Sequence, residues 1–528
     1  MDVAFVYPGY ESLGVEMLSA ALKQAGHRTK LVFEPALFDD PYIRLSPVNR
    51  WLGFRRATLE KIRALKPDLV CFSVTSFLYQ WGLATARAIK EVSPVPIAFG
   101  GIHPTVEPLE VISHPEVDYV VRAEGEHTLV ELVRALESGD VSAARLRQIP
   151  SLVFRDGSEP VSNPMRPLWS GLDELPPPDK QIYWEEHPLF RIGYNTFAQR
   201  GCPERCSFCY KTALRRVIDS PTYEWRRAPE HVVEEIERNR GEADIHFIRF
   251  IDDNFTTNPT WLRDFAELYG SRLKIPFWTQ VHPGAITPLT SQLLKQSGCV
   301  DVQMGVQSLN EDVRSGILKR SESIKRVERA IELLHEAGIT VAVDHILSVP
   351  GQTEEDLRNT VRFYLDNPVA RINVFWLAYL PGTDMTEEAI ASGEVGDELA
   401  RRIRTGEAAP SVLTGGHLFR RSNARFQTLL ILAGLLPARW TRFLLAHRLE
   451  RFLPYAGTIV STVATYWLSY KTKGARNDLY RIWTRIKYRD YLVRKLTGRT
   501  FRPEHVRWSE PDPAAGAPRG GMRVANAA

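Results

Sequence analysis

Cysteine is scarce in this chain, with five residues in 528. The number of cysteines is odd, and three of the five lie between residues 202 and 209, so they do not form the pattern of a disulfide framework. The amino-terminal stretch MDVAFVYPGY also lacks the basic and apolar regions of a secretory signal. We therefore expect a cytoplasmic protein that folds without disulfides.

A strong excess of charge of one sign is missing as well. The formal net charge is +4, and 25% of the residues are charged, so composition alone gives no reason to expect a nucleic-acid partner. The exception is local, because the stretch from Lys471 to Arg502 holds eleven Lys or Arg and two acidic residues. A length of 528 residues exceeds what one hydrophobic core usually supports, which predicts two or three packed regions.

The first 140 residues alternate short β-branched runs with amphipathic helical segments. Strands are expected over DVAFVYP, TKLVF, DLVCFSV, PIAFGG and VDYVVR, with helices between them. This alternation predicts a parallel, doubly wound sheet, so residues 1–140 are expected to form a Rossmann-like α/β domain.

The rest of the chain divides into four further parts. Residues 141–192 contain the Pro-rich run 175–179 and are expected to be a linker. Six strands alternate with helices over residues 193–393, which predicts a partial (β/α)6 barrel of the TIM type with its chemistry at the carboxyl ends of the strands. Residues 394–508 are helical and basic in pattern, and 509–528 have the composition of a disordered tail.

The strongest motif follows the first barrel strand, where Cys202, Cys206 and Cys209 have the spacing C-x3-C-x2-C. Three thiolates on one short loop can bind three irons of a [4Fe-4S] cluster and leave the fourth iron open to a small molecule. A structural zinc site is the alternative, but it would need a fourth Cys or His ligand, for which His187 is the nearest candidate upstream.

This spacing, with Phe208 before the last cysteine, resembles the radical S-adenosylmethionine superfamily. The resemblance implies that the open iron chelates S-adenosylmethionine, which the cluster cleaves to a 5'-deoxyadenosyl radical. No catalytic residue beyond the cluster ligands is assigned. Family contacts to S-adenosylmethionine map onto Phe208, the acidic strand end Asp252 and Asp253, and the later strand end with Gln307 and Ser308. The family commonly has Glu where this chain has Gln307, and a helix N-cap is the structural alternative for the two aspartates.

The first domain lacks the G-x-G-x-x-G loop, which argues against a dinucleotide. Its strand ends resemble instead the cobalamin-binding domain that precedes many radical S-adenosylmethionine barrels, over roughly residues 1–390 in all. The D-x-H-x-x-G signature is absent, and His103 is expected to be a loop residue rather than a cobalt ligand. The alternative is a domain of this type that binds nothing. The residues expected at cobalamin are Pro8, Leu13, Gly14, Ser73, Thr75, Ser76, Gly100, Gly101, Glu124 and Gly125.

An uncharged run of nineteen residues, Phe452 to Tyr470, is flanked by basic residues. Its Pro, Gly, Ser, Thr and Tyr content favours a buried helix over a membrane span. Together with the basic helix expected around Leu479 to Ile486, this run indicates peripheral contact with the inner face of an anionic membrane. Such contact would imply a lipid-like or other hydrophobic substrate. The alternative is a basic face that is only solvated.

These features together predict an enzyme that methylates an unactivated carbon of a small molecule, using a [4Fe-4S] cluster, S-adenosylmethionine and cobalamin. Flavodoxin or ferredoxin is the expected kind of electron donor. An oxidative cyclase or rearrangement enzyme resembling the anaerobic cyclase of bacteriochlorophyll synthesis is the main alternative. Two further alternatives are a non-catalytic cluster-binding regulator and an RNA methylthiotransferase. A methylthiotransferase would need a second set of clustered cysteines and an RNA-binding domain, which the sequence lacks, so no nucleic-acid partner is expected.

Overall fold

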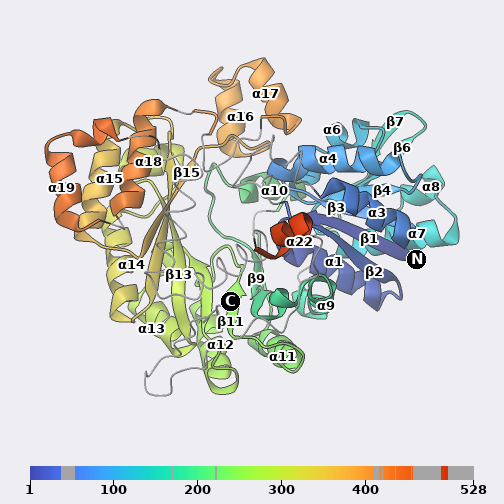
Figure 1. Ribbon diagram of the computed structural model, residues 1–528, viewed down its shortest axis with the longest axis horizontal. Coiled ribbons are helices and arrows are strands. Elements are labelled where there is room, and N and C mark those ends of the chain that lie inside the picture. The colour runs from blue at the N-terminus through green and yellow to red at the C-terminus, as the bar shows by residue number, and fades with distance from the viewer. Residues whose placement is uncertain are drawn as a thin grey trace.

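The computed structural model describes residues 1–36, 54–167, 171–220, 223–408, 416–418, 420–433, 436–453, 455 and 489–497. Most of the uncharged run 452–470, most of the basic segment 471–502 and the whole tail 509–528 lie outside these residues, so the expectations for them stay predictions. Two sheets dominate the described part, one on each side of the segment that holds β9 and α10 (Figure 1).

The first sheet has seven strands in the order β2-β1-β3-β4-β5-β6-β7. The first five are parallel and reproduce the doubly wound pattern, with a topological switch between β1 and β3. Their apolar residues are buried on both faces, as continuous β-branched runs require. The strands are β1 (Asp2–Pro8), β2 (Arg28–Glu34), β3 (Leu69–Ser73), β4 (Ile97–Gly100), β5 (Tyr119–Val121), β6 (Leu152–Asp156) and β7 (Glu159–Ser162).

The stretch expected to be a linker contributes to this sheet. Strand β6 pairs antiparallel with β5, and β7 pairs antiparallel with β6, so the sheet ends at residue 162 rather than at 140. The core apolar residues of β6 are buried, which is why this short run adds to the sheet instead of crossing solvent.

Helices cover both faces of the first sheet, and short helices lead to the second (Figure 1). They are α1 (Leu13–Gln24), α3 (Arg55–Leu65), α4 (Ser76–Lys90), α5 (Ile102–Val106), α6 (Pro108–Ser113), α7 (Glu126–Ser138), α8 (Ala143–Leu146), η1 (Leu172–Glu174), α9 (Gln181–Trp184) and η2 (Pro188–Arg191).

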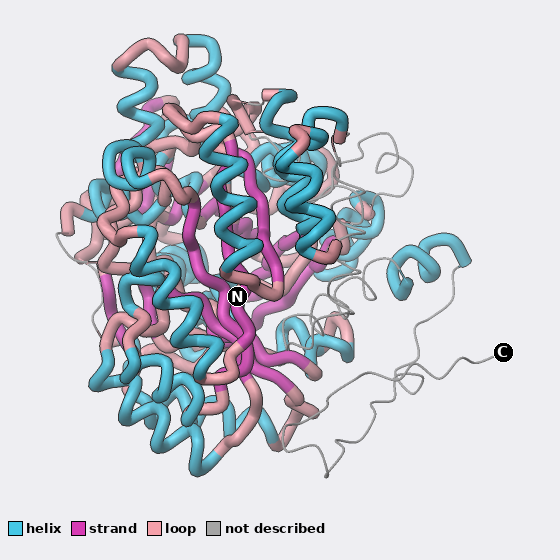
Figure 2. Tube along the Cα trace, turned by 90° about the vertical axis from the view of Figure 1, so that its left-hand side faces the viewer, coloured by secondary structure: helices cyan, strands magenta, loops and turns pink. Residues whose placement is uncertain are grey.

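The second sheet is the open, six-stranded barrel that the sequence predicts. Its strands are parallel in the order β15-β14-β13-β12-β11-β8 and form the magenta array that Figure 2 shows behind the helices. They are β8 (Gly193–Thr196), β11 (Phe247–Phe250), β12 (Phe277–Val281), β13 (Cys299–Gln307), β14 (Thr340–Leu347) and β15 (Arg371–Trp376).

The helices between these strands are α11 (Pro229–Arg240), α12 (Pro259–Arg272), α13 (Pro288–Gln296), α14 (Ile324–Glu336) and α15 (Glu354–Asp366), with the short turns η3 (Pro283–Ala285) and η4 (Val313–Ile317). Their apolar faces pack on the outer face of the sheet. Beyond it the chain is helical, as expected, in α16 (Asp384–Ala391), α17 (Asp397–Arg404), α18 (Arg421–Ala433), α19 (Ala438–Ala446), η5 (Leu449–Phe452) and α22 (Leu492–Thr497).

Candidate active site

The three clustered cysteines lie on a loop that follows the first barrel strand, β8, and begins at a small two-stranded hairpin. Strand β9 (Gln199–Gly201) pairs antiparallel with β10 (Glu224–Arg226), and helix α10 (Tyr210–Ile218) follows the last cysteine. Gly201 has φ +87°, and a Cβ there would lie 1.9 Å from the Tyr223 carbonyl oxygen. Only glycine fits at this close approach, so Gly201 fixes the direction in which the loop leaves the hairpin.

Backbone bonds from distant elements hold the loop in place. Ser207 N donates to the Leu318 carbonyl at 3.2 Å, and Met385 N donates to the Ser207 carbonyl at 3.0 Å. The Ser207 hydroxyl donates to the Ile317 carbonyl at 2.5 Å. The segment after β13 and the start of α16 therefore fix the middle of the cysteine loop.

The three thiols are free and at least half-buried. Burial raises the pKa of Cys202 to about 12 and that of Cys206 to about 11, and raises the pKa of Cys209 as well. A bound metal therefore has to displace the protons, which is the ordinary coupling of thiolate ligation to metal binding. Cys71 and Cys299, by contrast, are core residues of the two sheets.

Arg320 is a residue of this site that the sequence did not indicate. Its Nη1 lies 3.7 Å from Cys206 Sγ, and its Nη2 donates to the Gly305 carbonyl at 2.8 Å. The buried carboxylate of Glu322 accepts from Arg320 Nε at 2.8 Å and pairs with Arg314 at 2.5 Å. A guanidinium fixed beside a cluster thiolate suits the carboxylate of an amino-acid ligand. Only the fold brings residue 320 next to residue 206, so no local motif could have identified it.

The described part of the chain does not support a zinc site, because no group of three or more His, Cys, Asp or Glu side chains converges on one point there. A cubane cluster does not need that convergence, because each thiolate binds a different iron.

The two adjacent aspartates after β11 occupy different environments. Asp252 is fully buried, and both its carboxylate oxygens accept from Ala198 N at 3.1 Å, which ties the end of β8 to the end of β11. Burial raises the pKa of Asp252 to about 7. Asp253 is exposed and pairs with Lys211 Nζ of α10 at 2.9 Å. Neither caps a helix, because Asn258 caps α12 through Trp261 N.

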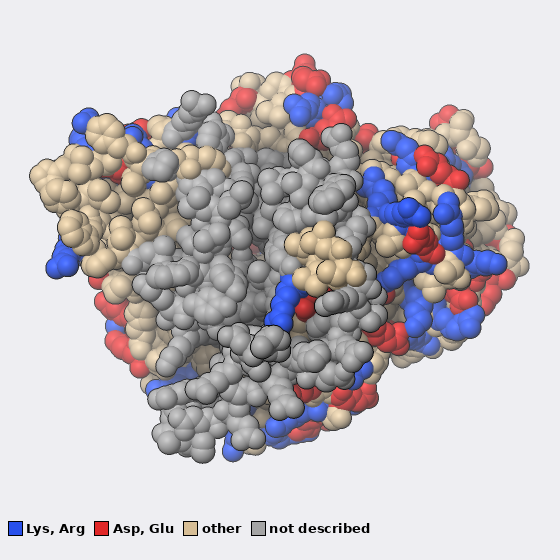
Figure 3. Space-filling model, in the orientation of Figure 1, with Lys and Arg blue, Asp and Glu red and all other residues tan. Residues whose placement is uncertain are grey.

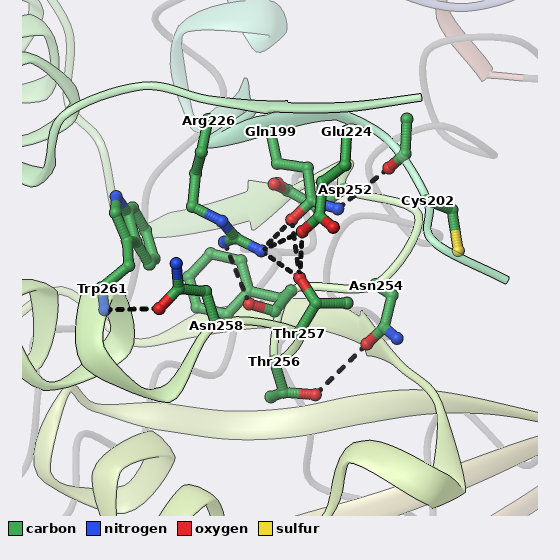
Figure 4. Close-up of polar contacts among 12 residues, drawn as sticks. Gln199, Cys202, Glu224, Arg226, Asp252, Asn254, Thr256, Thr257, Asn258 and Trp261 are labelled. Carbon is green, nitrogen blue, oxygen red and sulfur yellow. Dashed lines mark hydrogen bonds and ion pairs between the residues drawn. The ribbon is translucent and has the colours of Figure 1, made fainter. Parts of the chain in front are cut away.

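Figure 4 shows the polar network around this strand end. The Arg226 guanidinium contacts Gln199, Glu224 and Thr257, and so joins the hairpin to the loop after β11. Asn254 is buried, and its Oδ1 accepts from Thr256 Oγ1 at 3.2 Å and from His282 N at 3.3 Å. Its Nδ2 has no hydrogen-bond partner among the described residues. A buried donor of this kind is suited to an acceptor on a bound ligand.

The remaining residues predicted to contact S-adenosylmethionine lie at the same edge of the barrel. Gln307 has φ +69° and sits at a register shift between β13 and β14. Ser308 is buried, and its hydroxyl accepts from Asn310 N at 3.2 Å, which shapes the turn after β13. Phe208 packs on the apolar cluster that includes Val313 and Met385.

The residues predicted at cobalamin lie at the carboxyl ends of β1, β3, β4 and β5. Gly14 is exposed at the switch point and lies close to Ser73, since a Cβ on Gly14 would lie 4.0 Å from the Ser73 hydroxyl. Leu13 and Thr75, next to these two residues in the chain, are half-buried. Open sheets bind ligands at this crevice. Pro8 is buried, whereas Gly100, Glu124 and Gly125 are half-buried. Gly101 has φ +98°, and a Cβ there would lie 2.6 Å from the Val74 carbonyl oxygen, so this glycine is required by the chain's own backbone.

Ser76 connects the first domain to the cluster loop. Tyr210, the residue after Cys209, donates from its hydroxyl to Ser76 Oγ at 2.7 Å, and Ser76 Oγ lies 2.8 Å from His103 Nδ1. His103 is buried against the Tyr79 ring at 4.1 Å, and burial lowers its pKa to about 3. His103 is thus a neutral, buried residue of the short helix α5, not of a loop as expected, and it belongs to a polar chain that reaches the cluster loop.

Two groups of ion pairs, one around Arg200 and one around Lys180, join the same domains. Arg200 of β9 pairs with Glu126 at 2.5 Å and with Glu124 at 3.4 Å. Lys180, in the stretch between the sheets, pairs with Glu11 at 2.9 Å and with Glu16 at 2.6 Å. Asn195 of β8 also donates to Glu11, at 2.6 Å. The loops after β1, β3 and β5 therefore contact the cluster-bearing segment directly.

Comparisons with known proteins agree with this geometry. Residues 197–364 match the model of the Radical SAM superfamily, and residues 3–133 match that of the B12 binding domain. The anaerobic magnesium-protoporphyrin IX monomethyl ester cyclase of Cereibacter sphaeroides is 30% identical over 446 residues, which cover 79% of this chain and 68% of that protein. The chain belongs to the cobalamin-binding radical S-adenosylmethionine family.

An uncharacterized methyltransferase of Pyrococcus horikoshii is also similar to this chain. The two are 27% identical over 63% of this chain and 71% of that protein. The methyltransferase TsrM of Kitasatospora setae, solved with tryptophan and a SAM analog, has a TM-score of 0.59 at 19% identity and covers 75% of this chain and 77% of TsrM. OxsB, solved with aqua-cobalamin, has a TM-score of 0.64 at 13% identity, over 94% of this chain and 72% of OxsB. At these identities the two structures show the shared fold.

The predicted cofactors of this radical S-adenosylmethionine enzyme are thereby confirmed, and its residues fit them. Cys202, Cys206 and Cys209 would hold the [4Fe-4S] cluster. Arg320 and the buried amide of Asn254 offer a cation and a donor to S-adenosylmethionine beside it. The exposed edge at Gly14 and Ser73 would receive cobalamin.

Proposed function

We propose that this enzyme transfers a methyl group to an unactivated carbon of a small or lipid-like molecule. The observation that carries the proposal is the contact between the cluster segment and the switch-point side of the first domain, through Arg200–Glu126 and Tyr210–Ser76. A reaction that uses both cofactors on one substrate requires them to face a common space from which water is largely excluded.

When bound, S-adenosylmethionine with the cluster supplies a hydrogen-abstracting radical, and cobalamin supplies the methyl group. The protein's own residues position these groups. Gly201 and Ser207 fix the cysteine loop, and Arg320 places a permanent positive charge at Cys206. Arg226 holds the hairpin on the loop after β11, so that the strand ends and the cysteines form one rigid edge.

Oxidative cyclisation is the second candidate, because the cyclase of Cereibacter sphaeroides is 30% identical to this chain. Methyltransferase relatives and the fold of TsrM support the first. The two reactions give different products, since methyl transfer adds the methyl group of S-adenosylmethionine to the product and cyclisation does not.

The test uses the full chain, purified anaerobically with a reconstituted cluster and hydroxocobalamin, and S-adenosylmethionine carrying a deuterated methyl group. A labelled product from a metabolite extract, formed together with 5'-deoxyadenosine, supports methyl transfer. An unlabelled product formed together with 5'-deoxyadenosine supports cyclisation instead. Cys206→Ala should abolish both signals, while Cys299→Ala, a core thiol outside the loop, should keep them. Absence of 5'-deoxyadenosine from the wild-type protein would favour a non-catalytic role.

We further propose a flavodoxin or ferredoxin as electron donor, no nucleic-acid partner, and a cytoplasmic location with peripheral contact at the inner membrane face. Within the described residues, no helix is long and apolar enough to cross a bilayer.

A further inference from the structure

The exposed aromatic side chains of the described residues are concentrated in one short stretch. Trp440, Phe443, Phe452 and Tyr455 are the four large aromatic residues that solvent reaches substantially, with 53%, 48%, 70% and 39% of their surface exposed. All four lie within sixteen residues, on and just after α19. Single exposed apolar residues are normal, but a cluster of this kind marks a contact surface.

The exposed charged residues of this stretch are all basic. Arg439, Arg442, Arg448 and Arg451 are exposed, and Glu450, the acidic residue among them, is buried. Two of the arginines cover aromatic rings, Arg439 over Trp440 at 5.8 Å and Arg451 over Phe452 at 4.7 Å. Arg442 pairs with an acidic residue, Asp366 of α15, at 2.6 Å.

The stretch is held rigidly on the barrel. Thr441 and Leu445 are the buried residues of α19, and Glu450 pairs with Arg358 of α15 at 2.9 Å in the interior. Helix α19, which carries Trp440 and Phe443, lies at the end of the molecule away from the first domain (Figure 1). In Figure 3 the same end is mostly tan with separate blue groups.

We propose that this surface, defined by Trp440, Phe443, Phe452 and the four arginines, docks on an anionic lipid bilayer. Aromatic rings favour the boundary between headgroups and acyl chains, and arginine keeps its charge at the phosphates while its stem lies on apolar surface. Exposed aromatic residues combined with cationic charge are the signature of interfacial binding, and anionic lipid is the partner of complementary charge. The proposal stands independently of the reaction, because it requires no turnover.

The test is sedimentation of the full, cluster-loaded chain with vesicles. Wild type should pellet with phosphatidylglycerol-containing vesicles and much less with pure phosphatidylcholine, and the difference should shrink at high salt. Trp440→Ser combined with Phe443→Ser should lower the partition coefficient by roughly tenfold or more, since two exposed rings no longer enter the interface. Arg439→Gln with Arg448→Gln should remove the preference for anionic lipid.

Leu109→Ser with Leu289→Ser is the matched control, because both residues are exposed but lie outside the stretch. These two changes should leave the partition unchanged. Equal binding by wild type and the Trp440/Phe443 variant, or no preference for anionic vesicles, would overturn the proposal. A wild type that is dimeric in light scattering and becomes monomeric in that variant, without vesicle binding, would assign the surface to a second copy instead. Circular dichroism of each variant establishes that it is folded.

Discussion

Arg200 and Glu126 form an ion pair across the boundary between the two sheets, with Arg200 Nη2 2.5 Å from Glu126 Oε1. Arg200 lies two residues before the first cluster cysteine, and Glu126 begins α7 after the fifth strand. Burial alone would raise the pKa of Glu126, but Arg200 and backbone hydrogen bonding hold it below its usual value. The pair therefore links the cluster hairpin to the first domain.

A double-mutant cycle on this pair should show strong coupling. Arg200→Gln alone leaves a buried carboxylate without its cation, so we expect a loss of about 3–5 kcal/mol of stability. Arg200→Gln with Glu126→Gln should cost less than the sum of the single changes, with a coupling energy of about 1–3 kcal/mol. Thermal unfolding of the four proteins checks this. Additive single effects would show that the pair is not coupled.

Gly201→Ala should prevent the cluster from assembling. The added methyl group would meet the Tyr223 carbonyl, and φ +87° is strained for any other residue. We expect the hairpin to open, at a cost above about 2 kcal/mol, and the iron and sulfide content after reconstitution to fall severalfold. Gly241→Ala is the control, since a Cβ there would meet only the Arg238 carbonyl, at 3.6 Å. Full iron content in Gly201→Ala would contradict the role assigned to this glycine.

Asp252 should make stability depend on pH. Its pKa in the folded protein is raised to about 7 by burial, above the ordinary value near 4, so the folded state holds a proton that the unfolded state has lost. Stability from this group is therefore present below pH 4 and is lost as pH rises towards 7, by at most about 1.4 kcal/mol per pH unit. The difference in melting temperature between wild type and Asp252→Asn should shift in favour of the variant from pH 5 to pH 7.5. A constant difference would show that Asp252 is ionised throughout.

Lys180→Met should destabilise the protein strongly. It removes the cation that neutralises Glu11 and Glu16, both of which are buried. Losing one partner of such a cluster costs about 3–5 kcal/mol, which should lower the melting temperature by roughly 5 °C or more. Lys23→Met, which removes an exposed lysine paired with Asp179, should have a much smaller effect. Equal shifts for the two variants would argue against the buried cluster.

The sequence predicted most of the framework because its signals are local. The β-branched runs that became β1 and β13, and the cysteine spacing after β8, are each readable within about ten residues. Strand β6 was assigned to a linker because a single short strand carries no sign of its antiparallel partner.

The parts that sequence could not predict depend on contacts between distant residues. Arg320 reaches Cys206 across 114 positions, and Lys180 reaches Glu16 across 164. An isolated arginine or lysine carries no pattern that names its partner. Gly101 is expected at cobalamin, and the structure gives a second reason for a glycine there, because a Cβ would meet the Val74 backbone.

The position of Lys180 also determines where the first domain can be separated from the rest of the chain. All seven strands of its sheet are complete at Ser162, so residue 162 would be an obvious place to end an isolated cobalamin-domain fragment. Such a fragment would retain Glu11 and Glu16 and lose the lysine that pairs with both of them. A fragment intended to retain the native loop after β1 must therefore extend beyond residue 180, so the smallest self-sufficient unit is longer than its sheet.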